Sequence, residues 1–265
     1  SYGNAGILAE ASFLVMNNPG LLKILPKILL NRTYGVRVSL WFMIKRLPWF
    51  LKFLSYCHKS HVLHAAAAVR QLLTHSVDSH KGLIKAAGAE HLLRETGGLK
   101  LFRTEAGFAK FSKDFEILKS FGARFTVYDR EQIRQIEPGL KPVYCKAALM
   151  DETCAVSSPA ELTDAYVALF QKLVGFVEQT KVNGLCQKDA CWWVEGEAIK
   201  FSADELVLSA GAWSAEMASW LGYRLPMAWE RGYHMHLQQG EAPALHRAIH
   251  DIEAGFVLAP MKEGM

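Results

Sequence analysis

The run from residue 203 to residue 214, Ala-Asp-Glu-Leu-Val-Leu-Ser-Ala-Gly-Ala-Trp-Ser, constrains the fold more than any other segment. Residues 204–209 are typical of a buried strand, because their apolar side chains fall on both faces. The small residues at 210–212 then predict a tight turn into a helix that ends near Gly222. Small residues there let the backbone approach a ligand, and the start of a helix favours a phosphate group. An ordinary packing turn between strand and helix is the alternative.

The composition is that of a folded protein with a substantial core. Of 265 residues, 51% are hydrophobic, and the mean hydropathy is +0.06, which suffices for one or two domains. A net charge of +4 is too small to indicate a nucleic-acid partner. An odd number of cysteines without a Cys-x-x-Cys pair argues against a disulfide framework and favours a cytoplasmic setting. These cysteines are Cys57, Cys145, Cys154, Cys186 and Cys191.

The first half of the chain is predicted to be mainly helical. Residues 1–20 begin and end in turn signals, and residues 21–95 follow helical spacing. Pro26 and Pro48 are expected to break this region into pieces, and residues 60–89 are expected to form one long helix. The first 15 residues lack the basic start of a secretory signal, and no apolar run approaches the roughly 20 residues that cross a bilayer.

From about Thr96 onward, strands and helices mix. A helix that Thr104 caps is predicted to run to about Phe121, and a short helix is predicted at 130–136. Ser158-Pro159-Ala160-Glu161 has the pattern of a capping box and starts a helix that ends before Gly175. Further strands are predicted at 98–103, 125–128, 176–180, 182–187, 191–195, 197–202 and 227–237.

The segment 23–59 carries eight cations and no acid, among several aromatic residues. Aromatic and basic side chains on amphipathic helices suit the surface of a membrane. A pair of core helices with solvated basic edges is the alternative. The cations are Lys23, Lys27, Arg32, Arg37, Lys45, Arg46, Lys52 and Lys59, and the aromatic residues are Trp41, Phe42, Trp49, Phe50 and Phe53.

His58, His61 and His64 recur every third residue, next to Cys57. Three imidazoles on one side of a helix can bind a metal ion. No carboxylate occurs in 57–64, and Lys59 intervenes, so we predict no metal site.

Four ordered patterns span nearly the whole chain: Asn4-Ala5-Gly6; Gly-Gly-Leu-Lys-Leu-Phe-Arg-Thr-Glu at 97–105; Asp151-Glu152-Thr153 with the helix after it; and the run at 203–214. Together with Arg231-Gly232-Tyr233, they resemble the FAD-dependent D-amino-acid oxidase superfamily, and within it the bacterial D-amino-acid dehydrogenase type. That family begins with a Gly-x-Gly-x-x-Gly turn and ends with a segment that closes over the flavin. Neither is found here, so we expect an interior fragment.

The resemblance implies a mixed α/β (α+β) fold. We expect an antiparallel-rich substrate-binding sheet with helices, together with part of a Rossmann-like FAD-binding domain. The implied organisation is a flavin-proximal turn at 1–20, a helical and substrate-binding region at 21–174, a part of the FAD domain at 175–225, and a return to the substrate-binding sheet at 226–265.

The resemblance also implies the site. FAD is expected beside Asn4, Ala5, Gly6, Val182, Ala210, Gly211 and Trp213, and the substrate beside Arg231 and Tyr233. The alternative for Arg231 and Tyr233 is an arginine exposed to solvent and a tyrosine packed in the sheet. No catalytic side chain is expected, since the cofactor carries out the redox step.

The implied activity is oxidative deamination of D-amino acids or related amines, by hydride transfer from Cα to N5 of the flavin. The alternatives are a flavin-free binding module and a peripheral membrane-surface protein without catalysis. Expected partners are a small amino acid or amine, a quinone acceptor at a membrane surface, and a second copy of the chain. The expected location is the cytoplasm or the inner surface of the inner membrane.

Overall fold

The structure is a computed structural model. It describes residues 4–33, 35–228, 230–238, 240, 243–262 and 264. The chain forms two compact units, one of residues 1–173 with 234–265 and one of residues 174–233. Residues 1–3 of the predicted flavin-proximal turn lie outside the described residues.

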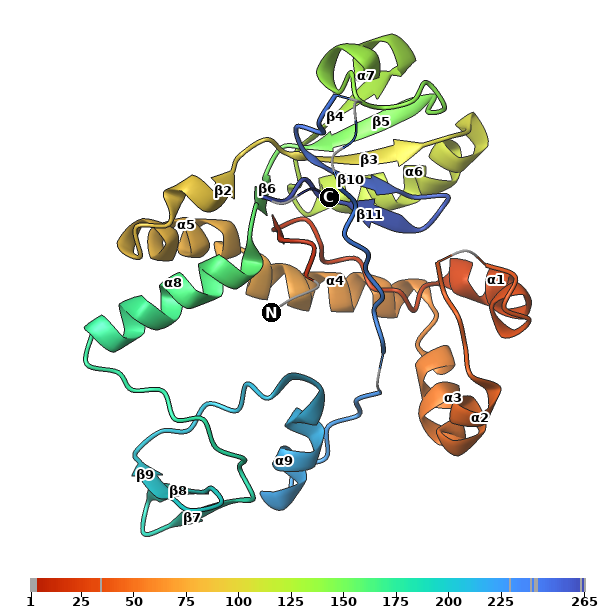
Figure 1. The fold of residues 1–265 in the computed structure, drawn as a ribbon. Helices are drawn as coiled ribbons and strands as arrows, with labels where there is room; N and C mark the ends of the chain where they lie inside the picture. The colour runs from red at the N-terminus through yellow and green to blue at the C-terminus, as the bar shows by residue number, and fades with distance from the viewer. Residues whose placement is uncertain are drawn as a thin grey trace. The chain divides into compact units, whose positions relative to one another are not determined.

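A five-stranded sheet forms the centre of the first unit (Figure 1). Its strand order is β11-β10-β3-β5-β4. All its neighbours are antiparallel except β10 and β3, which run parallel. The predicted antiparallel-rich sheet and the mixed α/β class are therefore confirmed. The strands are β3 (Gly98–Phe102), β4 (Phe125–Asp129), β5 (Lys146–Met150), β10 (Ala248–Asp251) and β11 (Phe256–Leu258).

Helices cover both faces of this sheet. Alternate residues of a strand point to opposite faces, so Phe102 packs on one face with Phe115 and Leu118 of α6 (Glu105–Ser120). Leu99 and Leu101 pack on the other face, against α7 (Arg130–Ile136). The predicted Thr104 cap of α6 is confirmed, because its side chain accepts the Gly107 N–H.

A smaller sheet, in the order β1-β6-β2, lies beside two helices. Its strands are β1 (Ile7–Ala9), β2 (Leu93–Arg94) and β6 (Thr153–Val156), and a 3-10 turn, η1 (Glu90–Leu92), precedes β2. Val156 packs in a shared core with Ile84 of α5 (Ser76–Ala86) and Leu162 of α8 (Pro159–Lys172). Ser158 caps α8 as predicted, whereas the Glu161 carboxylate pairs with Lys262.

The region 21–95 is mainly helical, as predicted, although β2 lies at its end, and two of its helix breaks differ from the prediction. Pro26 lies inside α1 (Pro19–Leu29), and its carbonyl still accepts the Leu30 N–H, so the helix continues past it. The predicted single helix over 60–89 is wrong: α4 (Lys59–Leu73) ends before His75, whose left-handed φ of 70° begins α5. The other helices are α2 (Leu40–Lys45) and α3 (Leu47–Ser55).

The second unit is a three-stranded antiparallel sheet with one helix. The sheet contains β7 (Gly184–Lys188), β8 (Cys191–Glu195) and β9 (Lys200–Ala203). A 3-10 turn, η2 (Gly211–Trp213), leads into α9 (Ser214–Trp220), which packs on β7.

Three predicted strands are wrong. Residues 176–180 and 204–209 are irregular, and so are the described residues of 227–237, a range in which Trp229 is masked. Val207, expected to be buried, is 83% exposed. A strand exists only where a neighbour pairs its backbone groups, and no described strand pairs with these segments.

Candidate functional site

Two of the expected flavin-proximal residues line a cavity of about 320 Å3, here called the N-terminal cavity. Asn4 and Gly6 reach it from the start of the chain, whereas Ala5 between them is exposed. Small-molecule sites begin at about this size. The other lining residues come from β1, α5, β6 and α8: Ile7, Leu8, His80, Val156, Pro159, Leu162, Thr163 and Tyr166.

Local hydrogen bonds fix the turn at Asn4–Gly6. The Gly6 N–H donates to Asn4 Oδ1 at 2.7 Å, and the Gly6 carbonyl accepts the Val156 N–H at 2.6 Å. Gly6 has a left-handed φ of 62°, and a Cβ on it would collide with the Val156 carbonyl. Glycine is therefore required here by conformation and by space, and the turn is held rigidly against β6.

His80 and Tyr166 are the titratable side chains on the wall of the N-terminal cavity. His80 Nδ1 lies 3.0 Å from Tyr166 Oη. Burial raises the pKa of Tyr166, so its hydroxyl remains a donor at neutral pH. Sequence reasoning missed this pair, because the two residues are 86 positions apart and meet only where α5 packs on α8.

The remaining expected cofactor residues belong to the second unit. Val182 is half-buried just before β7, and Ala210 is half-buried before η2. Gly211 has a left-handed φ of 56°, with open space where a side chain would stand. Trp213, at the end of η2, is 61% exposed. The predicted turn of small residues into a helix is thus present, and its contact with FAD stays a prediction.

The two expected substrate residues do not lie on a strand. Arg231 is exposed and Tyr233 is 86% exposed. The predicted period-two faces therefore do not exist in the described residues of 227–237, because these residues have no pairing partner there. The substrate role of Arg231 and Tyr233 stays a prediction.

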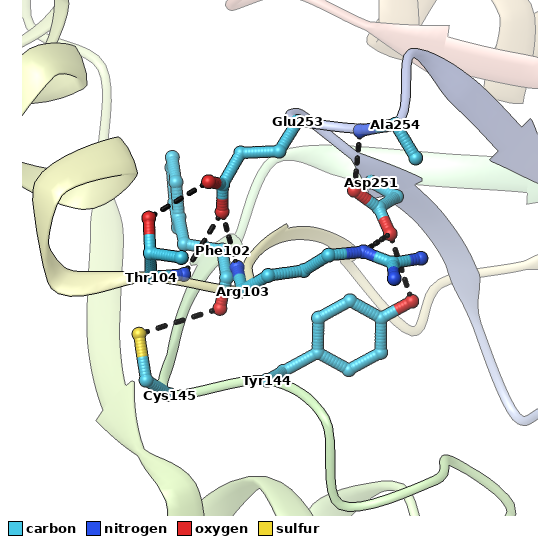
Figure 2. Close-up of polar contacts among 8 residues, drawn as sticks. All are labelled: Phe102, Arg103, Thr104, Tyr144, Cys145, Asp251, Glu253 and Ala254. Atoms are coloured by element: carbon cyan, nitrogen blue, oxygen red, sulfur yellow. Dashed lines mark hydrogen bonds and ion pairs between the residues drawn. The ribbon is translucent and has the colours of Figure 1, made fainter. Parts of the chain in front are cut away.

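A buried polar cluster joins the ends of β3 and β10 (Figure 2). The fully buried Asp251 carboxylate accepts hydrogen bonds from Arg103 Nε at 2.8 Å, Tyr144 Oη at 3.0 Å and the Ala254 N–H at 2.9 Å. Burial alone would raise the pKa of Asp251, but these donors and the Arg103 charge together lower it. The cluster holds an ionised carboxylate in the core, and Arg103 belongs to the 97–105 pattern.

One of the histidines considered as metal ligands caps a helix. His58 caps α4, since its Nδ1 accepts the His61 N–H at 3.2 Å. In the described part of the chain, no three His, Cys, Asp or Glu side chains are grouped to hold a metal ion. All five cysteines are free thiols.

The whole chain, residues 1–265, matches the family described as FAD dependent oxidoreductase (DAO). The chain therefore belongs to this family, and the resemblance found in its sequence is confirmed. FAD is the cofactor of the family by its description, which confirms the predicted cofactor class.

The relatives carry more specific names. The chain is 29% identical to a D-amino-acid oxidase of Bradyrhizobium diazoefficiens, over 91% of this chain and 58% of that protein. It is 26% identical to D-amino acid dehydrogenase 2 of Mesorhizobium japonicum, over 88% of this chain and 57% of that protein. The chain thus spans less than two thirds of the length of these relatives.

Among solved structures, the fold is similar to that of glycine oxidase from Geobacillus kaustophilus. The TM-score is 0.58 at 16% identity, over 75% of this chain and 53% of that chain. At this identity, the similarity establishes the fold and not the substrate.

The residues at the N-terminal cavity fit a bound flavin. The turn at Asn4–Gly6 presents a backbone to the cavity that its hydrogen bonds hold rigidly. Half of the surrounding wall is apolar, from Ile7, Leu8 and Leu162 among others, which suits a planar ring system.

Proposed function

We propose that the chain is part of an enzyme that oxidises D-amino acids or related amines at a bound FAD. The observation that carries this proposal is the Asn4–Gly6 turn, held rigidly at a cavity, in a member of the FAD dependent oxidoreductase family. The names of the two relatives support amino acids of the D series as substrates.

Bound FAD would supply the acceptor for a hydride from the substrate Cα, at N5 of its ring. The chain itself would bind and orient. Asn4 holds the turn beside the cofactor, and Ala210, Gly211 and Trp213 remain candidates for further contacts with it. The protonated Tyr166 hydroxyl and the His80 imidazole can hold a proton between Oη and Nδ1. Arg231 and Tyr233 remain candidates for the substrate carboxylate.

The test measures flavin first and turnover second. The 265-residue chain is incubated with FAD, freed of excess cofactor and denatured, and the released flavin is quantified. We expect FAD to be retained and its absorbance to bleach when a D-amino acid is added without oxygen. Asn4→Ala should lower FAD retention, because it removes the acceptor that fixes Gly6.

Asn18→Ala is the matched control for this variant. Asn18 Oδ1 accepts the Gly20 N–H with the same two-residue spacing, at the start of α1 and outside the cavity. Its substitution should leave FAD retention unchanged. If no flavin is released from the unmodified chain, the flavin-free binding module becomes the better explanation.

A second candidate function is binding to a membrane surface through α2 and α3. Neither helix buries a single residue, and together they expose Leu40, Trp41, Ile44, Leu47 and Leu51. Lys45 lies 4.9 Å from the Trp41 ring centre. Apolar side chains among cations fit the interface of a membrane that contains anionic lipid. No described helix is long and apolar enough to cross a bilayer.

Sedimentation with vesicles tests this candidate. We expect the chain to bind phosphatidylglycerol vesicles at low salt and to bind phosphatidylcholine vesicles weakly, because the attraction is partly electrostatic. Replacing Trp41 and Ile44 by serine should reduce binding. Leu72→Ser is the control, since Leu72 is 82% exposed on α4. Equal sedimentation with and without vesicles would exclude membrane binding. If the chain instead associates with itself, and the same substitutions abolish this association, a second copy of the chain covers α2 and α3. A quinone acceptor would be expected only if vesicle binding is observed.

A further inference from the structure

A second cavity, of about 340 Å3, lies between β1 and the five-stranded sheet. We call it the basic cavity, because two basic side chains, Lys100 and His250, line it. Two hydroxyl residues, Ser12 and Thr153, line it as well. No other feature of the fold or of the proposed function uses these four residues together.

The strand register brings the two basic residues together. On β3 and β10, Gly98 pairs with Ala248, and Lys100 pairs with His250. Alternate residues share a face, so all four point to the same side of the sheet. The pair of small residues leaves space on that face, and the pair of basic residues stands at its end. The cavity is thus a direct consequence of the order Gly-Leu-Lys on one strand and Ala-Ile-His on the other.

Neither basic side chain makes a hydrogen bond or an ion pair with a described residue. Lys100 Nζ lies 5.2 Å from the ring centre of Phe111 on α6. Burial lowers the pKa of Lys100, and the charge of Asp114 on the same helix partly opposes this. Lys100 is half-buried, and a partly desolvated cation without an ion-pair partner is unfavourable, so an anion beside Lys100 would be stabilised.

His250 has a similar environment. Burial and the nearby Lys100 charge lower its pKa, and Asp251, on the opposite face, partly opposes this. The imidazole is therefore kept neutral near Lys100, with a ring N–H free to donate. An ammonium, a neutral imidazole N–H and two hydroxyl groups can each donate a hydrogen bond to an anion.

We infer that the basic cavity binds the carboxylate of a small organic acid between Lys100 and His250, with Thr153 and Ser12 as further donors. Ile7 lines both this cavity and the N-terminal cavity. The carboxylate can belong to an amino acid or to a separate small acid. The inference itself requires neither bound FAD nor turnover.

The test titrates 13C-labelled acetate into the 265-residue chain at constant ionic strength and follows the acetate methyl signal by NMR. We expect saturable binding. Lys100→Met, which keeps the unbranched apolar part of the side chain and removes the charge, should weaken acetate binding about tenfold or more, as expected for the loss of a charged hydrogen bond. Lys100→Arg should retain most of the affinity, and His250→Gln should weaken it less than Lys100→Met.

Lys110→Met is the matched control. Lys110 lies exposed on α6, so its substitution changes the net charge equally and should leave acetate binding unchanged. Thermal melting of each variant shows whether it is folded. Absence of saturable acetate binding, or equal weakening by Lys100→Met and Lys110→Met, would overturn the inference and leave Lys100 as a lysine held by Phe111 and Asp114.

Competition identifies the source of the carboxylate. If D-alanine displaces acetate from the unmodified chain, and Lys100→Met binds neither acetate nor D-alanine at this site, the cavity accepts the carboxylate of an amino acid. If acetate binds and D-alanine fails to displace it, the cavity is a site for a separate small acid. Both results support a carboxylate site, and both are independent of FAD retention.

Discussion

Replacing the buried carboxylate of Asp251 should destabilise the first unit strongly. Asp251→Asn keeps the shape of the side chain but removes its charge and places an NH2 group among three donors, Arg103, Tyr144 and the Ala254 N–H. Each hydrogen bond to a charged group contributes about 1.5–3 kcal/mol, and removing one member of a buried ionic cluster costs about 3–5 kcal/mol. We therefore expect the free energy of unfolding to fall by about 3 kcal/mol.

The partners of Asp251 should have smaller effects, in a definite order. Tyr144→Phe removes one of three donors to the charged carboxylate and should cost about 1.5–2 kcal/mol. Arg103→Met should cost no more than about 1 kcal/mol, because the Arg103 side chain is 43% exposed and solvent screens its charge. Urea denaturation of the three variants, followed by circular dichroism, measures this order. An Arg103 variant less stable than the Asp251 variant would refute the view that the buried carboxylate is the centre of the cluster.

The same cluster predicts how stability depends on pH. The pKa of Asp251 is lowered in the folded state, whereas an unfolded aspartate titrates near pH 3.9. The stabilisation is therefore complete above about pH 4 and is lost as pH falls through the lower, folded pKa. Between about pH 5 and pH 2, the unmodified chain should lose more stability than Asp251→Asn. Parallel losses in the two proteins would show that other carboxylates dominate acid unfolding.

Two further substitutions test local conformation by thermal melting. Gly107→Ala should lower the melting temperature although alanine favours helices. The new Cβ would displace the Glu253 carboxylate, which accepts hydrogen bonds from the N–H groups of Arg103 and Thr104. Gly82→Ala in α5 should raise the melting temperature, because nothing lies within 4 Å of the new Cβ. His75→Gly should raise the free energy of unfolding by up to about 1 kcal/mol, since His75 has a φ of 70°, and a lower melting temperature would indicate that its side chain contributes more than its backbone costs.

The elements that the sequence predicts well are those that local signals define. The alternation at 98–102, the Thr104 cap and the helix at 130–136 each depend on residues within a few positions of one another. The structure confirms all three. For α7, the Asp129 side chain and Gln132 form a capping box, which fixes the helix start without help from distant residues.

The arrangement of these elements depends on contacts that no local pattern contains. β10 pairs in parallel with β3, about 150 residues earlier in the chain, and only this register places His250 beside Lys100. The meeting of His80 and Tyr166 likewise follows from the packing of α5 on α8. Sequence spacing could identify Asn4–Gly6 as a turn, but it could not identify which side chains complete the cavity around it.

At 204–209, the composition predicts a strand that the structure does not form. Its apolar residues indicate a strand covered on both faces, and strands of this kind belong to sheets with neighbours on either side. A local pattern can indicate that a segment requires neighbouring strands, but it cannot provide those strands. No described strand pairs with this segment, and Val207 is 83% exposed. An apolar segment that has an exposed side chain and no pairing strand favours association with another strand. The segment 204–209 therefore gives the physical reason for two expectations. It led to the prediction of part of an FAD domain, and its lack of a pairing strand is the reason to expect a second copy of the chain as partner.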